Sequence, residues 1–339
     1  MALNYTPSTY VGEHFEEIFT DVLFGTPTIT NKLVRFVPGI KYQESYTELT
    51  GGLTLQAYTP NRPTPSGNLK FGDKVVKNVK TTAYDEYDPN EIFRKTWFSK
   101  DLPAGVLNIE SNKGNQAILA RVIGDLQVKY EQLFWGGISA AQQTAIAAGG
   151  NAAYTTAGEK TYAAALTANA AGIDGVISKM ILDLAYSPAA ALATIVIPGT
   201  TLNATNIIAE IDKIYSAIPD AVLNNPTEMA DSYIYAPYSV MRFINQNNIS
   251  QTYRDKFTFV NGEYYYLGVK IVFVPMPTPN TMIFGDADDF IWQVDSLTDS
   301  ENAIDIGPVE RFSHIIGVRA DFSQAAGVMT LSQKILYIA

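Results

Sequence analysis

The stretch SNKGNQAILARVIGDLQVKYEQLFWGG, residues 111–137, predicts the longest helix of the chain. Its apolar residues recur three and four positions apart, which is the spacing of one buried helix face. Ser111 or Asn112 can cap the beginning of the helix, and the pair Gly136-Gly137 ends it. About 24 residues with a rise of about 1.5 Å each make a rod about 36 Å long. The segments on either side are rich in predicted strands, so the predicted class is α+β.

The residues before this helix predict a long β-hairpin without an apolar core of its own. Apolar and polar residues alternate in GLTLQAY (52–58), as in a strand with one covered face. The stretch TPNRPTPSGNLKFGD (59–73) is rich in proline and glycine. KVVKNVKTTAYDEYD (74–88) is predicted to return as a second strand with no consistently apolar face. Because a lone two-stranded hairpin is marginally stable in water, we expect this one to pack against another chain.

Residues 1–40 are predicted to form an arm rather than a domain, because they are polar, contain scattered aromatic residues and are interrupted by prolines. A short amphipathic helix is expected at 13–24. Aromatic rings are enriched at protein interfaces, and charged side chains in a hairpin can fix its register on a partner. The candidate intersubunit contacts are therefore Tyr10, Phe15, Phe19, Arg62, Lys70, Asp73 and Lys74.

The residues after the long helix predict a mixed second half. Residues 138–172 are rich in alanine, and we interpret them as a surface insertion or a pair of loose helices. Residues 173–283 alternate between helical and strand patterns. Within them, four isoleucines at 207–218 share one helix face, and the pair Asn261-Gly262 predicts a hairpin turn. Residues 300–339 are predicted to be mostly β.

Four aspartates crowd into MIFGDADDFIWQVD (282–295), and clustered carboxylates can bind metals. A calcium loop of the EF-hand type, counted from Asp286, requires Gly at its sixth position and Glu at its twelfth, where this chain has isoleucine and leucine. Acidic side chains are also favourable at the beginning of a helix. We therefore expect the strand to turn at its glycine, and Asp286 or Asp288 to cap a short helix, DDFIWQV (288–294).

The composition narrows the function classes. Only 17% of the residues are charged and 47% are hydrophobic, which is typical of a protein that buries much of its surface against partners. The net charge of −10 argues against tight binding to a nucleic-acid backbone, which requires clustered Lys and Arg. The absence of cysteine excludes disulfides, thiolate catalysis and Cys-ligated zinc. No secretory signal and no apolar stretch of about 20 residues is present, so a soluble cytoplasmic protein is expected.

No other motif supports catalysis or cofactor binding. The stretch GNLKFGDK (67–74) begins like a phosphate-binding loop but has no Lys-Ser or Lys-Thr after its second glycine, and we interpret it as an ordinary loop. His14 lies three residues before Glu17, which is at most half of a metal site, and His314 is interpreted as structural. The sequence therefore predicts no catalytic residue, no cofactor and no metal.

The order of these parts, together with five short phrases, resembles the major capsid proteins of tailed double-stranded DNA phages, which have the Hong Kong-97-like fold. The phrases are GIDGVISKMILDL (172–184), NIIAEIDKIYSAIPDAVLNN (206–225), YIYAPYSVMRFINQ (233–246), YYYLGVKIVFVPMPTPNTMIFGDADDF (264–290) and GVRADFSQAAGVMTL (317–331). The resemblance covers most of the chain outside the alanine-rich segment and includes no catalytic signature.

The resemblance implies an N-terminal arm, an extended β-hairpin loop that lies across a neighbouring subunit, a peripheral domain around a spine helix, and an axial domain. The implied ranges are 1–40 for the arm, 41–100 for the extended loop, 101–137 for the spine helix and peripheral domain, 138–172 for the insertion, 173–295 for the axial domain, 296–329 for the peripheral return and 330–339 for the last axial strand. Some members of this family cross-link a lysine of the extended loop to an asparagine. Lys70 and Lys74 are placed for that reaction, but no partner asparagine is identified.

The function that the resemblance implies is that of a structural protein rather than an enzyme. It would assemble with copies of itself, as hexamers and pentamers, into an icosahedral phage head around double-stranded DNA. Scaffolding, portal and decoration proteins are further implied partners, and no membrane is involved. Assembly is expected in the cytoplasm of a bacterial host, with the virion as the final location. Two alternatives stay open: an encapsulin-like nanocompartment shell, and a metal-assisted hydrolase that uses Asp286, Asp288 and Asp289.

Overall fold

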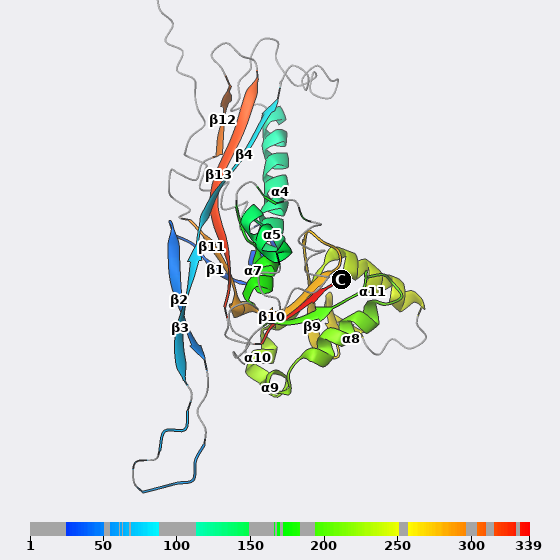
Figure 1. Ribbon diagram of the computed structural model, residues 1–339. Helices are drawn as coiled ribbons and strands as arrows, with labels where there is room; N and C mark the ends of the chain where they lie inside the picture. Colours follow the sequence, from blue (N-terminus) through cyan, green and yellow to red (C-terminus); the bar gives the residue numbers. More distant parts are fainter. Residues whose placement is uncertain are drawn as a thin grey trace, which may run out of the picture.

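The chain forms a long body, a second body at its side and a hairpin that projects from one end (Figure 1). The computed structural model describes residues 25–50, 55–60, 62, 64–67, 69–87, 113–148, 166, 168–169, 172–183, 194–250, 257–295, 304–309, 315–329 and 333–339. The long body is built on a five-stranded sheet and the side body on a seven-stranded sheet. Helices and strands are both prominent, which confirms the predicted α+β class.

The five-stranded sheet is organised around its longest strand, β13. Its strands are β1 (Arg35–Val37), β4 (Val79–Tyr87), β11 (Phe290–Val294), β12 (Ile304–Pro308) and β13 (Ile316–Val328). β4 pairs antiparallel with one edge of β13, while β11 and β12 share the opposite edge. β1 then runs parallel to β11. The region before the long helix therefore contributes two strands to the sheet of the long body.

The central strands of the seven-stranded sheet are covered on both faces. In spatial order its strands are β5 (Ile195–Pro198), β14 (Ile335–Ile338), β10 (Thr281–Asp286), β6 (Ser232–Pro237), β9 (Val269–Val274), β8 (Glu263–Tyr266) and β7 (Phe257–Val260). Successive side chains point to opposite faces, so Ile234 enters the core of the side body and Tyr235 enters the core shared with the long body. Burial on both faces explains why β10 and β14 are nearly continuous apolar runs in the sequence, whereas β7 at the edge is largely exposed.

Helices cover these sheets. They are α2 (Pro27–Thr30), α4 (Lys113–Gly136), α5 (Ala140–Ala147), α7 (Val176–Asp183), α8 (Ile207–Ala217), α9 (Asp220–Leu223), α10 (Pro226–Ala230) and α11 (Tyr238–Ser250). α8 and α11 pack on each other and on the seven-stranded sheet, and α4 and α7 pack on each other and on β13 (Figure 1). The predicted long helix is confirmed, and it ends at Gly136 as expected.

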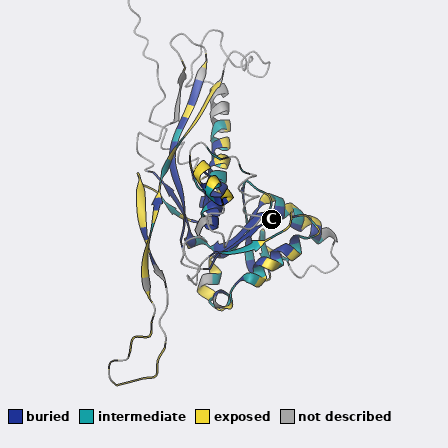
Figure 2. Ribbon diagram, viewed as in Figure 1, coloured by how far each residue is buried: buried dark blue, intermediate teal, exposed yellow. Residues whose placement is uncertain are grey.

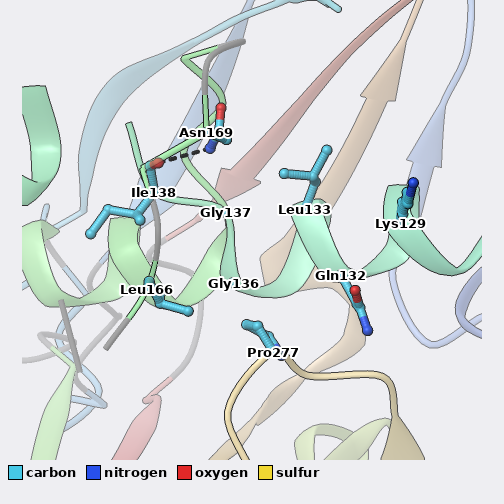
Figure 3. A pocket seen from close by; sticks show the side chains of 9 residues that line it. All are labelled: Lys129, Gln132, Leu133, Gly136, Gly137, Ile138, Leu166, Asn169 and Pro277. Carbon is cyan, nitrogen blue, oxygen red and sulfur yellow. Dashed lines mark hydrogen bonds between the residues drawn. The ribbon is translucent and has the colours of Figure 1, made fainter. Parts of the chain in front are cut away.

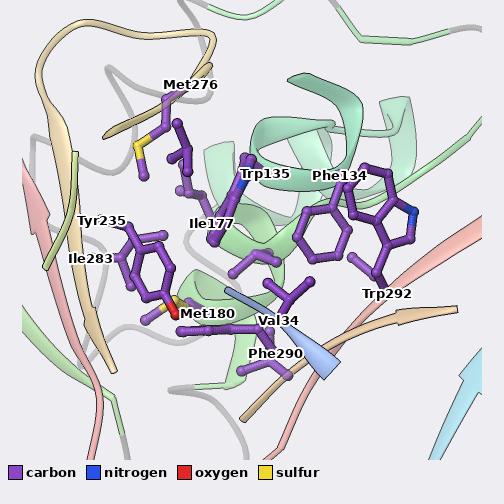
Figure 4. Packing of buried hydrophobic residues seen from close by; sticks show 14 of the residues in the cluster. Val34, Phe134, Trp135, Ile177, Met180, Tyr235, Met276, Ile283, Phe290 and Trp292 are labelled. Atoms are coloured by element: carbon purple, nitrogen blue, oxygen red, sulfur yellow. The ribbon is translucent and has the colours of Figure 1, made fainter. Parts of the chain in front are cut away.

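An aromatic cluster joins the two bodies near the end of α4 (Figure 4). Phe134 stacks on Trp292 of the five-stranded sheet with ring centroids 4.3 Å apart. Trp135, the next residue, lies against Tyr235 of the seven-stranded sheet at 4.9 Å. All four rings are buried, and buried residues run through both sheets at this level (Figure 2). Because each ring buries a large apolar area, the cluster fixes one body to the other.

The projecting hairpin consists of β2 (Gln43–Thr50) and β3 (Lys70–Lys77), which pair antiparallel. Its base packs on the face of the five-stranded sheet opposite α4, where Tyr46 and Val76 contact Ile291. The Tyr46 hydroxyl also donates a hydrogen bond to the side chain of Gln293 at 3.2 Å. Gly327 permits this approach, since a β-carbon there would lie 2.8 Å from a methyl group of Val76. The hairpin base is therefore anchored to its own chain.

Three local predictions are wrong. The described part of 52–58, residues 55–58, is not a strand, and the hairpin strands flank it on both sides. The supposed loop 67–74 contains the first residues of β3. The segment 288–294 is not a helix: a short 3-10 turn is followed by β11, whose five residues are all buried. The first prediction is wrong because residues 55–58 alternate in polarity but pair with no strand among the described residues. The last is wrong because a strand buried on both faces lacks the alternation that separates it from a helix.

Other local predictions are confirmed. The isoleucines at 207–218 line α8, and Asn261-Gly262 connects β7 to β8. Both turn residues have positive φ values, 53° and 87°, which this pair tolerates well. Residues 300–339, where described, contain three strands. The predicted arm helix at 13–24, His14 and His314 lie outside the described residues.

Candidate functional site

The aspartate cluster of residues 285–290 is a corner between the two sheets. β10 belongs to the seven-stranded sheet and β11 to the five-stranded sheet, and the 3-10 turn η1 (Ala287–Asp289) joins them. Asp286 accepts a hydrogen bond from the backbone N–H of Asp288 at 2.8 Å, which confirms its predicted capping role. Gly285 lies within β10 and not in a turn, with the Phe290 ring packed over it.

Asp289 holds the corner to another part of the chain. It is completely buried and forms an ion pair with buried Lys334, with 3.4 Å between Nζ and Oδ2. Its backbone carbonyl accepts a hydrogen bond from the N–H of Met329 at 2.7 Å. A buried carboxylate is costly unless it is paired. These contacts therefore tie the corner to the segment that leads from β13 into β14.

The three carboxylates do not form a metal site or an acid–base pair. Asp286 is half-buried and caps the turn, Asp288 is exposed, and Asp289 is buried beside Lys334. Within the described part of the chain, no group of three or more His, Asp or Glu residues could hold a metal ion. Burial raises the pKa of Asp286 to about 6; the Asp288 N–H opposes this, and the charges of Asp289, Asp288 and Asp231 add to it. The arrangement is that of a structural corner, and the hydrolase alternative has no support.

A buried glutamate on α4 holds the segment that precedes β1. Glu131 accepts hydrogen bonds from the backbone N–H of Thr28, at 3.0 Å, and from the Thr28 hydroxyl. The indole N–H of Trp135 donates to the same hydroxyl oxygen at 3.1 Å. Burial raises the pKa of Glu131, and its hydrogen bonds from Thr28 oppose that rise. The residue acts as a clamp on α2 rather than as an exposed acid.

A second clamp lies in the side body. Glu210 of α8 accepts hydrogen bonds from Tyr337 at 2.8 Å, Thr200 at 2.9 Å and Lys213 at 2.7 Å. Burial works to raise the pKa of Glu210, but the hydrogen bonds from Lys213, Tyr337 and Thr200 outweigh it and lower the pKa. The carboxylate is thus held ionised, and it attaches α8 to the last strand of the sheet.

A shallow groove lies at the C-terminal end of α4 (Figure 3). Its lining residues are Lys129, Gln132, Leu133, Gly136, Gly137, Ile138, Leu166, Asn169 and Pro277. The side-chain amide of Asn169 donates to the Ile138 carbonyl at 2.8 Å and so holds the wall of the groove in place (Figure 3). Lys129 is the one titratable side chain among these nine residues, so the groove lacks a nucleophile–base pair.

The projecting hairpin carries the most exposed apolar side chains of the described residues. Leu55 is 99% exposed, Tyr58 92% and Phe71 77%. The loop at its tip surrounds an open hollow, and the Gln56 side chain spans the loop to the Thr64 carbonyl at 2.7 Å. Contiguous exposed apolar groups on a soluble protein mark protein contacts. None of the three is among the contact residues predicted from the sequence, although the apolar alternation at 52–58 was a signal for the first two.

The structure places four of the predicted contact residues on this hairpin. Arg62 is exposed in the tip loop, and Lys70 is the first residue of β3. Asp73 is exposed and accepts a hydrogen bond from the Thr47 hydroxyl at 3.0 Å. Lys74 is half-buried, opposite Tyr46 in the β2–β3 register. The remaining three, Tyr10, Phe15 and Phe19, lie outside the described residues, and the contact role of all seven stays a prediction.

Solved structures share this fold over most of the chain. A chain from the satellite phage P4 procapsid including size determination (Sid) protein matches with a TM-score of 0.55 and 10% identity, covering 99% of this chain and 93% of that one. A chain from the capsid of an empty GTA particle matches with a TM-score of 0.51 and 8% identity, covering 91% and 88%. The chain has the fold of a phage capsid protein.

A chain from Gordonia phage Cozz adds to this likeness, with a TM-score of 0.50, 14% identity, and coverage of 92% of this chain and 86% of that one. No protein-family model and no curated protein matches the sequence. At these identities the likeness is one of fold, and it confirms the capsid resemblance seen in the sequence at that level. Among the described helices, none combines the length and the apolar character that crossing a membrane requires.

Proposed function

We propose that this protein is a major capsid protein, which assembles with copies of itself into the hexamers and pentamers of an icosahedral phage head. The observation that carries the proposal is the extent of the shared fold: the match to the procapsid chain covers 99% of this chain, hairpin and both sheets included. A fold shared over one domain would leave room for a different function in the remainder. Here nearly the whole chain is accounted for.

The surface of the molecule supports assembly. Exposed apolar groups gather at two places far apart in the fold, the hairpin tip and the β7–β8 turn, where Phe259 is 64% exposed. Contacts between two different patches are heterologous, and they close into rings when the rotation between copies is right. Obligate interfaces of about 2,000–5,000 Å² are more apolar than ordinary surfaces, which suits a chain with only 17% charged residues.

The proposed roles of the parts follow the capsid resemblance. Residues 1–40 serve as the arm, 41–100 contain the extended loop, and the axial domain at the centre of each ring comes from 173–295 with the last strand at 330–339. α4 and the five-stranded sheet form the peripheral domain, which therefore also takes β1 from the arm range and β11 from the axial range. Within 41–100, the projecting part is limited to the hairpin, because β4 pairs with β13 along its whole length.

The enclosed cargo in this proposal is double-stranded DNA, held without sequence-specific contacts. A net charge of −10 leaves the shell without a clamp on phosphates, so packaged DNA can slide during filling and release. Scaffolding, portal and decoration proteins are proposed as further partners, the bacterial cytoplasm as the place of assembly, and the virion as the destination. No catalytic step is assigned to the chain.

Electron microscopy of the expressed protein tests the proposal. The expected result is closed shells in which this chain is the main component, with light scattering showing particles far larger than a 37.1 kDa monomer. Particles isolated from the native source should contain double-stranded DNA, whereas a nanocompartment shell would contain a protein cargo instead. A protein that remains monomeric at all concentrations, and that is missing from particle walls, contradicts the proposal.

A further inference from the structure

The turn between β7 and β8 brings together two residues that can react with each other. It consists of Asn261 and Gly262, both exposed, and the flanking residues Val260 and Glu263 pair across the hairpin. Asn261 is the one asparagine of the sequence that is followed by glycine. Because glycine has no β-carbon, no side chain shields its backbone nitrogen from the amide carbon of the residue before it.

Neither of the two reacting groups is held in the folded protein. Among the hydrogen bonds of the described residues, none uses the Asn261 side chain or the Gly262 N–H. Other asparagines are fixed by theirs: Asn169 donates to two backbone carbonyls, at 2.8 and 2.6 Å, and accepts from a backbone N–H at 2.8 Å. Asn245 accepts a hydrogen bond from a tyrosine hydroxyl at 3.1 Å. The Asn261 side chain is therefore free to turn toward the backbone that follows it.

The surrounding hairpin allows the turn to open. β7 has four residues, three of them exposed, and among the described strands it pairs only with β8. Short, exposed segments at the edge of a sheet open locally at a small cost in free energy. Opening is needed because the hairpin holds both turn residues in the left-handed region, with φ values of 53° and 87°, and ring closure between them requires the backbone to rotate.

We propose that Asn261 is a site of spontaneous covalent modification, at which the Gly262 nitrogen closes a succinimide ring. In this step the Gly262 nitrogen bonds to Cγ of Asn261, the bond from Cγ to Nδ2 breaks, and ammonia leaves with the proton of the Gly262 nitrogen. Water then opens the ring. Its addition at Cγ gives aspartate, and its addition at the backbone carbonyl carbon gives isoaspartate, in which the main chain runs through the former side chain.

Both products change the hairpin. Each adds a negative charge beside Glu263, whose carboxylate already accepts hydrogen bonds from Lys270 at 2.7 Å and from Tyr265 at 2.6 Å. Isoaspartate also lengthens the main chain of a turn whose length sets the register of the hairpin. Phe259 and Val260 are exposed next to the turn, so the modification alters one of the two apolar surfaces assigned to assembly. That consequence rests on the proposed function, whereas the reaction itself does not.

Peptide mapping of the full chain tests the reaction. During incubation at neutral pH, the peptide that contains Asn261 should acquire the mass of the acid, and isoaspartyl methyltransferase should methylate it. The rate should rise severalfold from weakly acidic to weakly alkaline pH, because ring closure uses the deprotonated Gly262 nitrogen. Aspartate without isoaspartate would indicate direct hydrolysis of the side chain and would overturn the proposal, as would an unchanged peptide.

Gly262→Ala separates ring closure from simple exposure. Alanine is strained at a φ of 87°, so the hairpin should open more often, yet the added methyl group shields the backbone nitrogen. Modification of Asn261 should therefore be severalfold slower than in the wild type, and faster modification would refute ring closure. Circular dichroism checks that the variant folds, and the isoaspartate measurement on the wild type decides the matter if it does not.

Asn261→Gly is the matched control for the consequences, since it keeps a turn that tolerates positive φ and removes the reactive amide. Hydrogen exchange of residues 257–266 should become faster as the wild type ages and stay constant in this variant. Aged wild-type protein should form severalfold fewer particles than fresh protein, and Asn261→Gly should keep its yield. Equal yields from fresh and aged wild type would refute the effect on assembly. If fresh protein never forms particles, the proposed function fails, while the peptide map still decides the chemistry at Asn261.

Discussion

At the scale of single residues, Asp286 shows how surroundings change a carboxyl group. Burial and neighbouring aspartates raise its pKa to about 6, so the folded protein holds this proton more tightly than the unfolded chain. Stability from this group is therefore complete below about pH 4 and is lost as the pH rises toward 6. Asp286→Asn keeps the cap and removes the titration. As the pH rises from about 4 to about 6, the wild type should lose unfolding free energy and Asp286→Asn should not. The variant should therefore become more stable relative to the wild type by about 1 kcal/mol, a value reduced because the group is half exposed.

Denaturant unfolding at several pH values measures this difference. Asp220→Asn, at an exposed position in α9, changes the net charge by the same amount and is the matched control. It should follow the wild type in parallel. A constant difference between Asp286→Asn and the wild type from pH 4 to pH 7 would contradict the prediction.

Gly175 is a residue whose missing side chain is required. It lies where the chain before α7 crosses the end of α4, and its N–H donates to the Gly137 carbonyl at 2.9 Å. A β-carbon there would lie 2.6 Å from the Gly137 nitrogen and 2.7 Å from the Leu133 carbonyl oxygen. Since both obstacles are backbone atoms, Gly175→Ala should lower the unfolding free energy by about 1–3 kcal/mol.

Gly124→Ala is the control for this change. Gly124 lies in the middle of α4 with open space around its α-carbon, so alanine should stabilise the helix by about 0.5–1 kcal/mol. Thermal unfolding of the two variants side by side compares them. Equal stability of the two variants would show that the segment before α7 can move away from the end of α4 at little cost.

At the scale of elements, the hairpin combines an anchored base with an exposed tip. Its base is held by Tyr46 and Val76, whereas residues 55–60 and 64–67 are exposed. Replacing 59–70 by a short Gly-Ser turn should leave the monomer folded and abolish most assembly, because the anchors remain and the reach is lost. Hydrogen exchange of residues 55–75 should be fast in the unassembled wild type and slow in particles.

A Gly-Ser segment of the original length, twelve residues, is the matched control. It restores the length of the loop but not its prolines or the side chains of Arg62, Leu69 and Lys70. It should assemble no better than the short turn if these side chains matter, and better if length alone matters. Normal particles from the short-turn variant would show that assembly does not require the hairpin tip.

The elements differ in how well the sequence predicts them. α4 was predictable because one amphipathic face and a glycine pair define it locally, and the β7–β8 turn because Asn261-Gly262 has one preferred geometry. The strand β11 was not, since Phe290–Val294 is buried on both faces and its pattern alone does not separate strand from helix. The corner role of Asp286 was predictable as a cap, but the Asp289–Lys334 pair links residues 45 positions apart and leaves no local signal.

At the scale of the whole molecule, the two bodies depend on a few buried links. One is the Asp289–Lys334 pair, which lies where the five-stranded sheet passes into the seven-stranded sheet. Lys334→Met would leave a carboxylate buried without this partner, which costs about 3–5 kcal/mol in comparable sites. We expect a matching fall in the unfolding free energy, measured by denaturant titration of the unassembled protein.

Lys270→Met offers the comparison. Its ion pair with Glu263 has a similar chemistry, at 2.7 Å, but lies partly in solvent. Water compensates an exposed charge, so this variant should lose much less stability. Equal losses would mean that burial at the corner does not set the strength of the link.

The strand order of the side body has a consequence for synthesis on the ribosome. β14 lies between β5 and β10, yet it is made after every other strand of that sheet. Until it emerges, β10 has one open edge, and all but the last of its residues are of the kind that the finished fold buries. A nascent chain at that stage exposes an apolar strand with an unpaired edge, which chaperones or other nascent chains on the same messenger RNA can bind. The seven-stranded sheet is thus completed late, and under the proposed function this delays assembly until its translation has finished.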